Sequence, residues 1–110
     1  NDSFPSAINI ATALLVKNNL IPSMKRIQAT LKGQSKKWDK VIKVGRTHLQ
    51  DATPLSLGQE FSGYEAMVSS NIKRVEQSFG SLLNLAQGGT AVGSGLNTKR
   101  NFDKYMSKNY

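Results

Sequence analysis

The sequence predicts an all-α fold built from long antiparallel helices. Apolar residues recur every three or four positions over most of the 110 residues, which is the spacing of one helix face. The clearest such stretch lasts for about eight turns, or roughly 45 Å at 1.5 Å per residue. A helix of that length outruns a compact domain of this size. We therefore expect a helical bundle whose apolar faces need partners from further chain or from other subunits.

The first helix is expected over about residues 3–43, with a break near Pro22. Proline removes one backbone hydrogen bond and crowds the preceding turn, so the interruption should fall near residues 18–22. The apolar positions that place this helix are Phe4, Ala7, Ile8, Ala11, Leu14, Leu15, Leu20, Met24, Ile27, Leu31, Trp38, Val41 and Ile42.

The second helix is expected over about residues 54–87. Thr53 is suited to the N-cap and Pro54 to the first helical position, while Gly88 and Gly89 are suited to the end. A third helix is expected to begin after residue 98. Residues 1–110 should together form part of one helical domain of a longer chain, without a complete second domain. The first residues, Asn1-Asp2, lack an initiator methionine, and we expect a fragment.

The composition excludes several kinds of site. There is no cysteine, which excludes disulfides and thiolate metal sites. The single histidine has no carboxylate partners at metal-ligand spacing, so no metal is expected. No apolar run approaches the ~20 residues that span a bilayer, so we expect neither a membrane segment nor a signal peptide.

The net charge of +8 comes from 15 Lys and Arg against 7 Asp and Glu. Such an excess fits nucleic-acid binding, the attraction of a small anionic substrate, or simply a solvated basic face. The lysines of the first helix are scattered and lack the interleaved aromatic residues that stack on bases. Nucleic acid is therefore not the expected partner.

The densest polar stretch is "GRTHLQDATP", residues 45–54, which contains the only histidine. The imidazole of His48 can exchange a proton near neutral pH, and the Thr47 hydroxyl and the Gln50 amide can bind a carboxylate. Arg46 can pair with an anion or with Asp51. The alternative is a histidine that merely caps or bridges a loop. Functional side chains favour loops held by rigid elements, which supports a site here.

A second polar stretch, "GGTAVGSGLNT" at residues 88–98, is rich in glycine. It lacks the Gly-Lys-Ser/Thr ending of a phosphate-binding loop, and no strand precedes it as in a dinucleotide-binding fold. We expect a tight loop in which backbone approaches backbone.

The two stretches, extended to residues 45–64 and 88–98 and preceded by "NDSFP" at residues 1–5, resemble class II fumarate hydratase over essentially the whole chain. The Gly-x-Thr-His-x-Gln pattern is shared across the fumarase/aspartase superfamily, and the continuation Asp51-Ala52-Thr53-Pro54-Leu55 is typical of fumarases. Ser56 and Ser94 stand where that family often has threonine. The resemblance implies a fumarase/aspartase-type central helical bundle.

The resemblance also implies an activity, the reversible hydration of fumarate to L-malate in the tricarboxylic acid cycle, without metal or organic cofactor. It implies that Thr47 and Asn1 bind substrate and that His48 is catalytic, positioning or activating water beside a glutamate of another subunit. Arg46, Gln50 and Asp51 would support the site. The family's serine loop lies outside this chain. Active sites would be shared between subunits of a homotetramer, in the cytoplasm or the mitochondrial matrix, and these 110 residues alone should be inactive.

Two other functions remain open from the sequence. Aspartate ammonia-lyase or another fumarate-releasing lyase shares the superfamily pattern, although aspartases usually carry glutamine at the position of His48. A basic helical nucleic-acid-binding module is supported only by the charge of +8.

Overall fold

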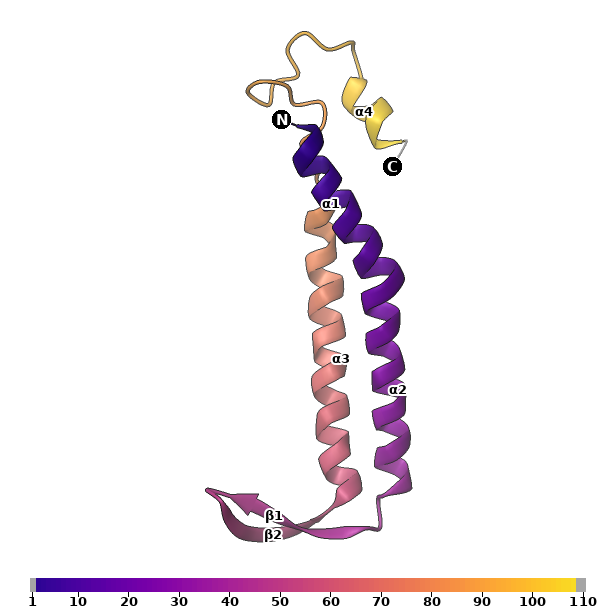
Figure 1. Ribbon diagram of the computed structural model, residues 1–110, viewed down its shortest axis with the longest axis vertical. Coiled ribbons are helices and arrows are strands. Elements are labelled where there is room, and N and C mark those ends of the chain that lie inside the picture. The colour runs from indigo at the N-terminus through magenta and orange to yellow at the C-terminus, as the bar shows by residue number, and fades with distance from the viewer. Residues whose placement is uncertain (1, 109–110) are drawn as a thin grey trace. The chain divides into compact units, whose positions relative to one another are not determined.

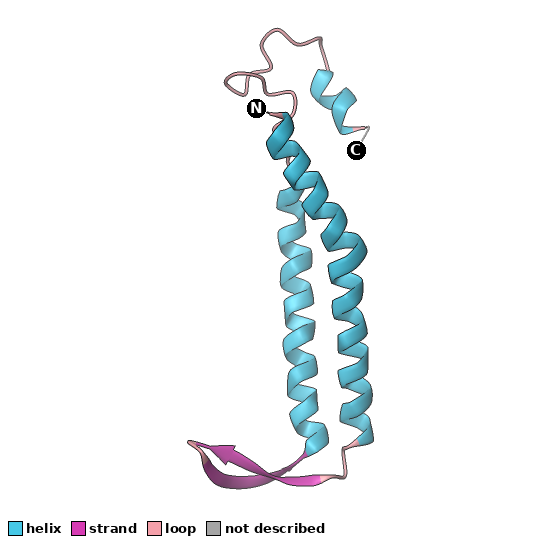
Figure 2. Cartoon of the chain, viewed as in Figure 1, coloured by secondary structure: helices cyan, strands magenta, loops and turns pink. Residues whose placement is uncertain are grey.

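The computed structural model describes residues 2–108, and Figure 1 shows its elements in chain order. Helix α1 (Ser3–Leu15) is followed by the π-helical turn η1 (Val16–Leu20) and helix α2 (Ile21–Lys37). Strands β1 (Ile42–Thr47) and β2 (Gln50–Ser56) form a hairpin, and helices α3 (Leu57–Leu82) and α4 (Phe102–Ser107) complete the order. The predicted all-α architecture of long helices is confirmed, with one small two-stranded sheet added to it (Figure 2).

The chain divides into two compact units. The first contains Asn1–Asn19 and Glu76–Tyr110, and the second contains Leu20–Val75. In the second unit, α2 and residues 57–75 of α3 run antiparallel and are joined at one end by the hairpin (Figure 1). The Gln28 side chain donates a 2.7 Å hydrogen bond to Glu65 between these helices. Trp38, Phe61 and Tyr64 stack edge to face, with ring centroids 4.8 Å and 5.6 Å apart.

The interruption at Pro22 takes the form of a π-helical turn. η1 occupies residues 16–20, and Pro22 lies in the first turn of α2. A proline cannot donate to the carbonyl four residues before it, and the wider π turn accommodates the ring and the missing donor. The structure therefore has a change of helical pitch where the sequence predicted a break.

The first helical stretch also ends earlier than predicted. α2 stops at Lys37, and residues 42 and 43, the last two of the predicted helix, lie in β1. The Trp38 carbonyl accepts hydrogen bonds from the amides of Val41 and Gly58, at 3.0 Å each. These bonds turn the chain out of the helix and tie its end to the start of α3.

The start of α3 corrects a second prediction. Thr53 and Pro54 lie in β2, and the helix begins at Leu57. Ser56 is the N-cap, since its hydroxyl accepts the Gln59 amide at 3.0 Å and the Gln59 side chain accepts the Ser56 amide at 2.8 Å. This reciprocal pair is a capping box, and it satisfies two amides that a bare helix end leaves unpaired. Pro54 is tolerated because a two-stranded ribbon has only edge strands.

α3 ends at Leu82, five residues before the predicted end at 87. Beyond Leu82, side chains of α1 hydrogen-bond to the backbone. Asn9 donates to the Asn84 carbonyl at 3.0 Å, and the Ser6 hydroxyl accepts from the Gln87 amide at 2.9 Å. Helical hydrogen bonding cannot continue through groups that are already paired. These contacts lie within the first unit.

Burial is sparse in the described chain. Ile72 is the only buried hydrophobic side chain among residues 2–108, at 5% exposure. Several large apolar side chains on the helices are more than half exposed, among them Leu14, Leu15, Ile27 and Met67. The stripe predicted for α1 is thus left uncovered within the described chain, whereas Phe61, Val68, Val75 and Phe79 of the α3 stripe are half-buried. Within the described residues, no helix is long and apolar enough to cross a membrane.

Candidate functional site

The polar stretch around His48 folds as a β-hairpin rather than as a simple link between helices. β1 and β2 pair antiparallel, with Thr47 opposite Gln50, so the turn consists of His48 and Leu49. Both turn residues have positive φ, at 50° and 62°. A two-residue turn with two positive φ values matches the right-handed twist of the flanking strands, and it usually carries Asn or Gly. His48 is therefore held at a hairpin tip in a conformation that few side chains favour.

The register of the hairpin gathers five predicted site residues. Thr47 pairs with Gln50 directly beside the turn, and Arg46 pairs with Asp51 one step further. The Arg46 Nε donates to the Asp51 carboxylate at 3.2 Å, and both side chains are more than 70% exposed. This is the internal pairing that the sequence allowed for Arg46. An exposed pair of this kind contributes little to stability, and its effect is to orient the two strands.

The predicted residues at the tip offer suitable groups but no enclosure. Thr47, His48 and Gln50 are all exposed in the described chain, and Leu49 between them is 96% exposed. A hydroxyl, an imidazole and an amide can bind a carboxylate and transfer a proton, but both functions weaken in open water. Asn1, the other predicted substrate-binding residue, lies outside the described residues. Within residues 2–108, no three His, Asp or Glu side chains gather as metal ligands would.

A bulge at Gly45 shapes the hairpin below its tip. The register shifts between Val44 and Arg46. A Cβ on Gly45 would lie 2.6 Å from the Thr53 carbonyl oxygen, closer than any real contact. Glycine is therefore required for the two strands to approach here. The bulge increases the local twist and turns the tip residues relative to the base.

At the base of the hairpin, three polar side chains form a network that the sequence did not reveal. Lys43 Nζ donates to one carboxylate oxygen of Glu60, and the Tyr64 hydroxyl donates to the other at 2.8 Å. The hydrogen bonds from Lys43 and Tyr64 lower the pKa of Glu60, and the bond to Glu60 raises the pKa of Tyr64. The spacing of four between Glu60 and Tyr64 allows this pair to be predicted on a helix. The contact between Lys43 and Glu60, which are 17 residues apart, cannot be predicted from spacing.

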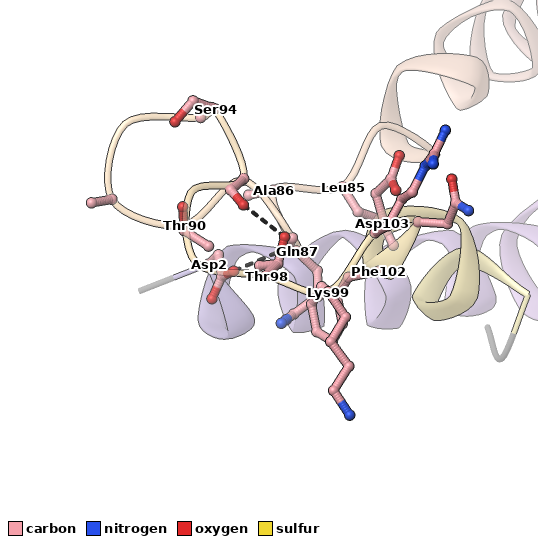
Figure 3. Close-up of a pocket in the computed structure, with 17 residues that line it drawn as sticks. Asp2, Leu85, Ala86, Gln87, Thr90, Ser94, Thr98, Lys99, Phe102 and Asp103 are labelled. Atoms are coloured by element: carbon pink, nitrogen blue, oxygen red, sulfur yellow. Dashed lines mark hydrogen bonds between the residues drawn. The ribbon is translucent and has the colours of Figure 1, made fainter.

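The glycine-rich stretch forms the predicted tight loop in the first unit. Gly88, Gly93 and Gly95 have positive φ, and a Cβ on Gly88 would approach the Asp103 backbone at 3.3 Å. The Asp2 carboxylate accepts the Gly88 amide at 3.1 Å. Asp2 lines an open hollow of about 1170 Å³ together with residues 85–91, 93–95 and 98–103. Figure 3 shows the side chains that line it. Asp2 and Ser6 thus anchor this loop on α1, a role that their sequence positions did not suggest.

Comparison with known proteins gives the chain its family. A family model described as lyase matches residues 1–109. The chain is 55% identical over 109 residues to the class II fumarate hydratase of Rickettsia conorii, covering 98% of this chain and 24% of that protein. It is also 55% identical over 103 residues to the mitochondrial fumarate hydratase of Saccharomyces cerevisiae, covering 94% of this chain and 21% of that protein. The chain thus spans about a quarter of the length of these curated relatives.

Solved structures agree. The class II fumarase of Schistosoma mansoni superposes with a TM-score of 0.88 at 40% identity, over 92% of this chain and 21% of that one. A fumarate lyase:delta crystallin from Brucella melitensis bound to cobalt superposes with a TM-score of 0.84 at 30% identity, over 96% of this chain and 24% of that one. The fold, the hairpin sequence and these matches agree, and the chain belongs to the lyase family as a homologue of class II fumarate hydratases.

Proposed function

We propose that the full-length protein containing this chain is a fumarate hydratase, which reversibly hydrates fumarate to L-malate. The observation that carries the proposal is the 55% identity to fumarate hydratases across a segment that includes the whole Thr47-His48 hairpin. The substrates are dicarboxylates. The basic balance of the chain, +8 overall, favours the approach of such anions.

The tip residues suit the steps of this reaction. In the hydration direction, a neutral His48 imidazole takes a proton from water as the oxygen attacks the double bond of fumarate. The electron pair of the double bond moves toward the neighbouring carboxylate, so that the other alkene carbon becomes the α-carbon of an aci-carboxylate intermediate. That carbon then takes a proton from a further acid. In the reverse direction, the protonated imidazole returns its proton to the departing hydroxyl, which leaves as water. Thr47 and Asn1 hydrogen-bond the substrate carboxylates, where negative charge accumulates.

The exposed tip and the exposed helix faces support a shared site in a homotetramer. His48 stands at a hairpin end without enclosure in the described chain, and catalysis of this kind needs water to be excluded. The exposed apolar side chains of α1, such as Phe4 and Leu15, likewise require covering surfaces. Subunit packing would supply both. The cross-strand pairs formed by Arg46, Gln50 and Asp51 fix the conformation of the hairpin tip. In the full-length protein, residues 1–110 form part of a central helical domain.

The proposed setting follows the relatives. Their names include a mitochondrial enzyme from yeast and class II enzymes from bacteria, so we propose the cytoplasm or the mitochondrial matrix. The proposed reaction uses no metal or organic cofactor, because acid, base and hydrogen-bond donors suffice for adding water to fumarate.

The experiment is a substrate comparison with the full-length protein. Malate and fumarate should interconvert, as followed by the ultraviolet absorbance of fumarate, while aspartate should release no ammonia. Aspartate deamination without malate turnover would instead identify an aspartate ammonia-lyase. Steeply salt-dependent binding to nucleic acid in the absence of either turnover would identify a basic binding module.

A further inference from the structure

The hairpin is held only lightly at its base. Backbone hydrogen bonds from Leu57 to the Val41 carbonyl, at 2.7 Å, and from Gly58 to the Trp38 carbonyl, at 3.0 Å, fix the point where it leaves the helices. Beyond that point the apolar side chains of β1 are exposed, Ile42 by 70% and Val44 by 39%, and Leu55 of β2 is only half-buried. An open hollow of about 310 Å³ at the base is lined by residues of both strands together with Asp39 and Gln59. Apolar packing within the described chain therefore does not fix the angle of the hairpin.

The Lys43–Glu60–Tyr64 network is placed to fix that angle. Lys43 is on β1, while Glu60 and Tyr64 lie one turn apart on α3. Glu60 accepts from both donors, one at each carboxylate oxygen. The Tyr64 ring is itself held edge-on against Phe61, with centroids 5.6 Å apart. The network thus adds a side-chain connection from β1 to a helix face that is anchored by aromatic contacts.

Because the hairpin is long, a small change in its angle at this network produces a large displacement of its tip. Five residues separate Lys43 from His48, which is a lever of about 16 Å at roughly 3.3 Å per residue. A tilt of about 4° at the base then moves the tip by about 1 Å, and a misplacement of about 1 Å can reduce catalysis about a hundredfold. A contact that restricts the base by a few degrees is therefore strong enough to matter.

We propose that Glu60 is a positioning residue for the active site, which clamps β1 to α3 through Lys43 and Tyr64 and so fixes the place of His48. This inference rests on the proposed function for its catalytic consequence. Its structural part, the clamp itself, stands independently. Glu60 does not touch substrate; it acts through the hairpin.

The clamp is tested by hydrogen exchange on the full-length protein, measured peptide by peptide with mass spectrometry. Lys43→Gln and Glu60→Gln should each speed exchange in residues 42–56 severalfold and leave exchange in the helical residues 68–82 unchanged. Lys43→Arg should retain slow exchange, because arginine can also pair with the carboxylate. Lys40→Gln removes an exposed lysine just before the strand and serves as the matched control. Unchanged hairpin exchange in both Gln variants would overturn the clamp.

Activity then tests positioning. Lys43→Gln and Glu60→Gln should each lower kcat/KM by about tenfold to a hundredfold, and the double variant should be no worse than either single one, since all three break one contact. Lys43→Arg should restore activity, and Lys40→Gln should keep it. Additive losses, or wild-type activity despite faster exchange, would reject the positioning role. A wild-type protein without fumarate turnover would reject the proposed function, while the exchange data would still decide on the clamp.

Discussion

His48 and Leu49 share the left-handed backbone conformation at the hairpin tip, with φ of 50° and 62°. That conformation costs a residue with a Cβ about 1–2 kcal/mol. Asparagine and glycine would avoid most of this cost, yet the chain has a leucine that is 96% exposed. Strained backbone of this kind is found mainly at functional sites, and it persists only where the surrounding structure holds it in place. Here the cross-strand pairs Thr47–Gln50 and Arg46–Asp51 hold the turn.

Substitutions at Leu49 should therefore rank by their tolerance of positive φ. Leu49→Asn should slow hydrogen exchange in residues 42–56, because it relieves roughly 1 kcal/mol of strain. Leu49→Val should speed exchange, since a β-branched side chain tolerates this conformation poorly. The reverse order would show that the turn is not strained at this position.

Gly58, at the start of α3, lies against the backbone at the end of α2 and just beyond it. A Cβ there would lie 2.4 Å from the Ser35 carbonyl oxygen and 2.7 Å from the Asp39 Cα. Gly58→Ala should lower the free energy of unfolding by about 1–3 kcal/mol, because backbone atoms would have to move. Gly63 has nothing within 4 Å, so Gly63→Ala should raise it by up to about 1 kcal/mol. Denaturant midpoints of the full-length protein measure both, and equal effects would contradict the packing described here.

At the scale of elements, the helices were predictable and the hairpin was not. The three-four spacing of apolar residues continues through α1, α2 and α3, because one face of each helix is apolar. The hairpin gives a weak signal. Its strands carry few alternating apolar residues, Gly45 interrupts them with a bulge, and the turn His48-Leu49 lacks the Asn-Gly pattern.

The start of α3 shows how two local signals can compete. Thr53-Pro54 fits an N-cap and first helical residue, and Ser56-x-x-Gln59 fits a capping box. The structure uses the second, because Thr53 and Pro54 lie inside β2, whereas Ser56 ends the strand and its hydroxyl accepts the Gln59 amide of α3. Strand pairing is a tertiary fact that the local sequence does not contain. For the same reason the sequence located the polar residues 46–51 together but missed Lys43 and Glu60.

The Glu60 network also predicts how stability depends on pH. Its hydrogen bonds hold the pKa of Glu60 below the usual 4.5. A lowered pKa contributes stability that is present above pH 4.5 and is lost as pH falls through the lowered value. The gap in denaturant midpoint between wild type and Glu60→Gln should therefore be constant near neutral pH and close under acid conditions. High salt should narrow it, because the pair is partly exposed. A gap that widens in acid would contradict this sign.

At the scale of the whole molecule, the described chain is a partial structure whose surfaces require partners. One hydrophobic side chain is buried among residues 2–108, while the helix faces and the hairpin tip are exposed. The chain spans about a quarter of its relatives. The sequence predicted this incompleteness, because helices of this length cannot cover one another. We expect the isolated 110 residues to lack turnover, and the full-length protein to carry it only as an assembly.

The central claim is that the hairpin presents His48 to a fumarate-hydrating site. Its most direct test is His48→Asn in the full-length protein, assayed for malate–fumarate interconversion alongside sedimentation for the assembly state. We expect turnover to fall about a hundredfold or more, because an acid–base group is lost, while the assembly stays unchanged. Wild-type turnover, or a variant that fails to assemble, would contradict it and make His48 a structural residue.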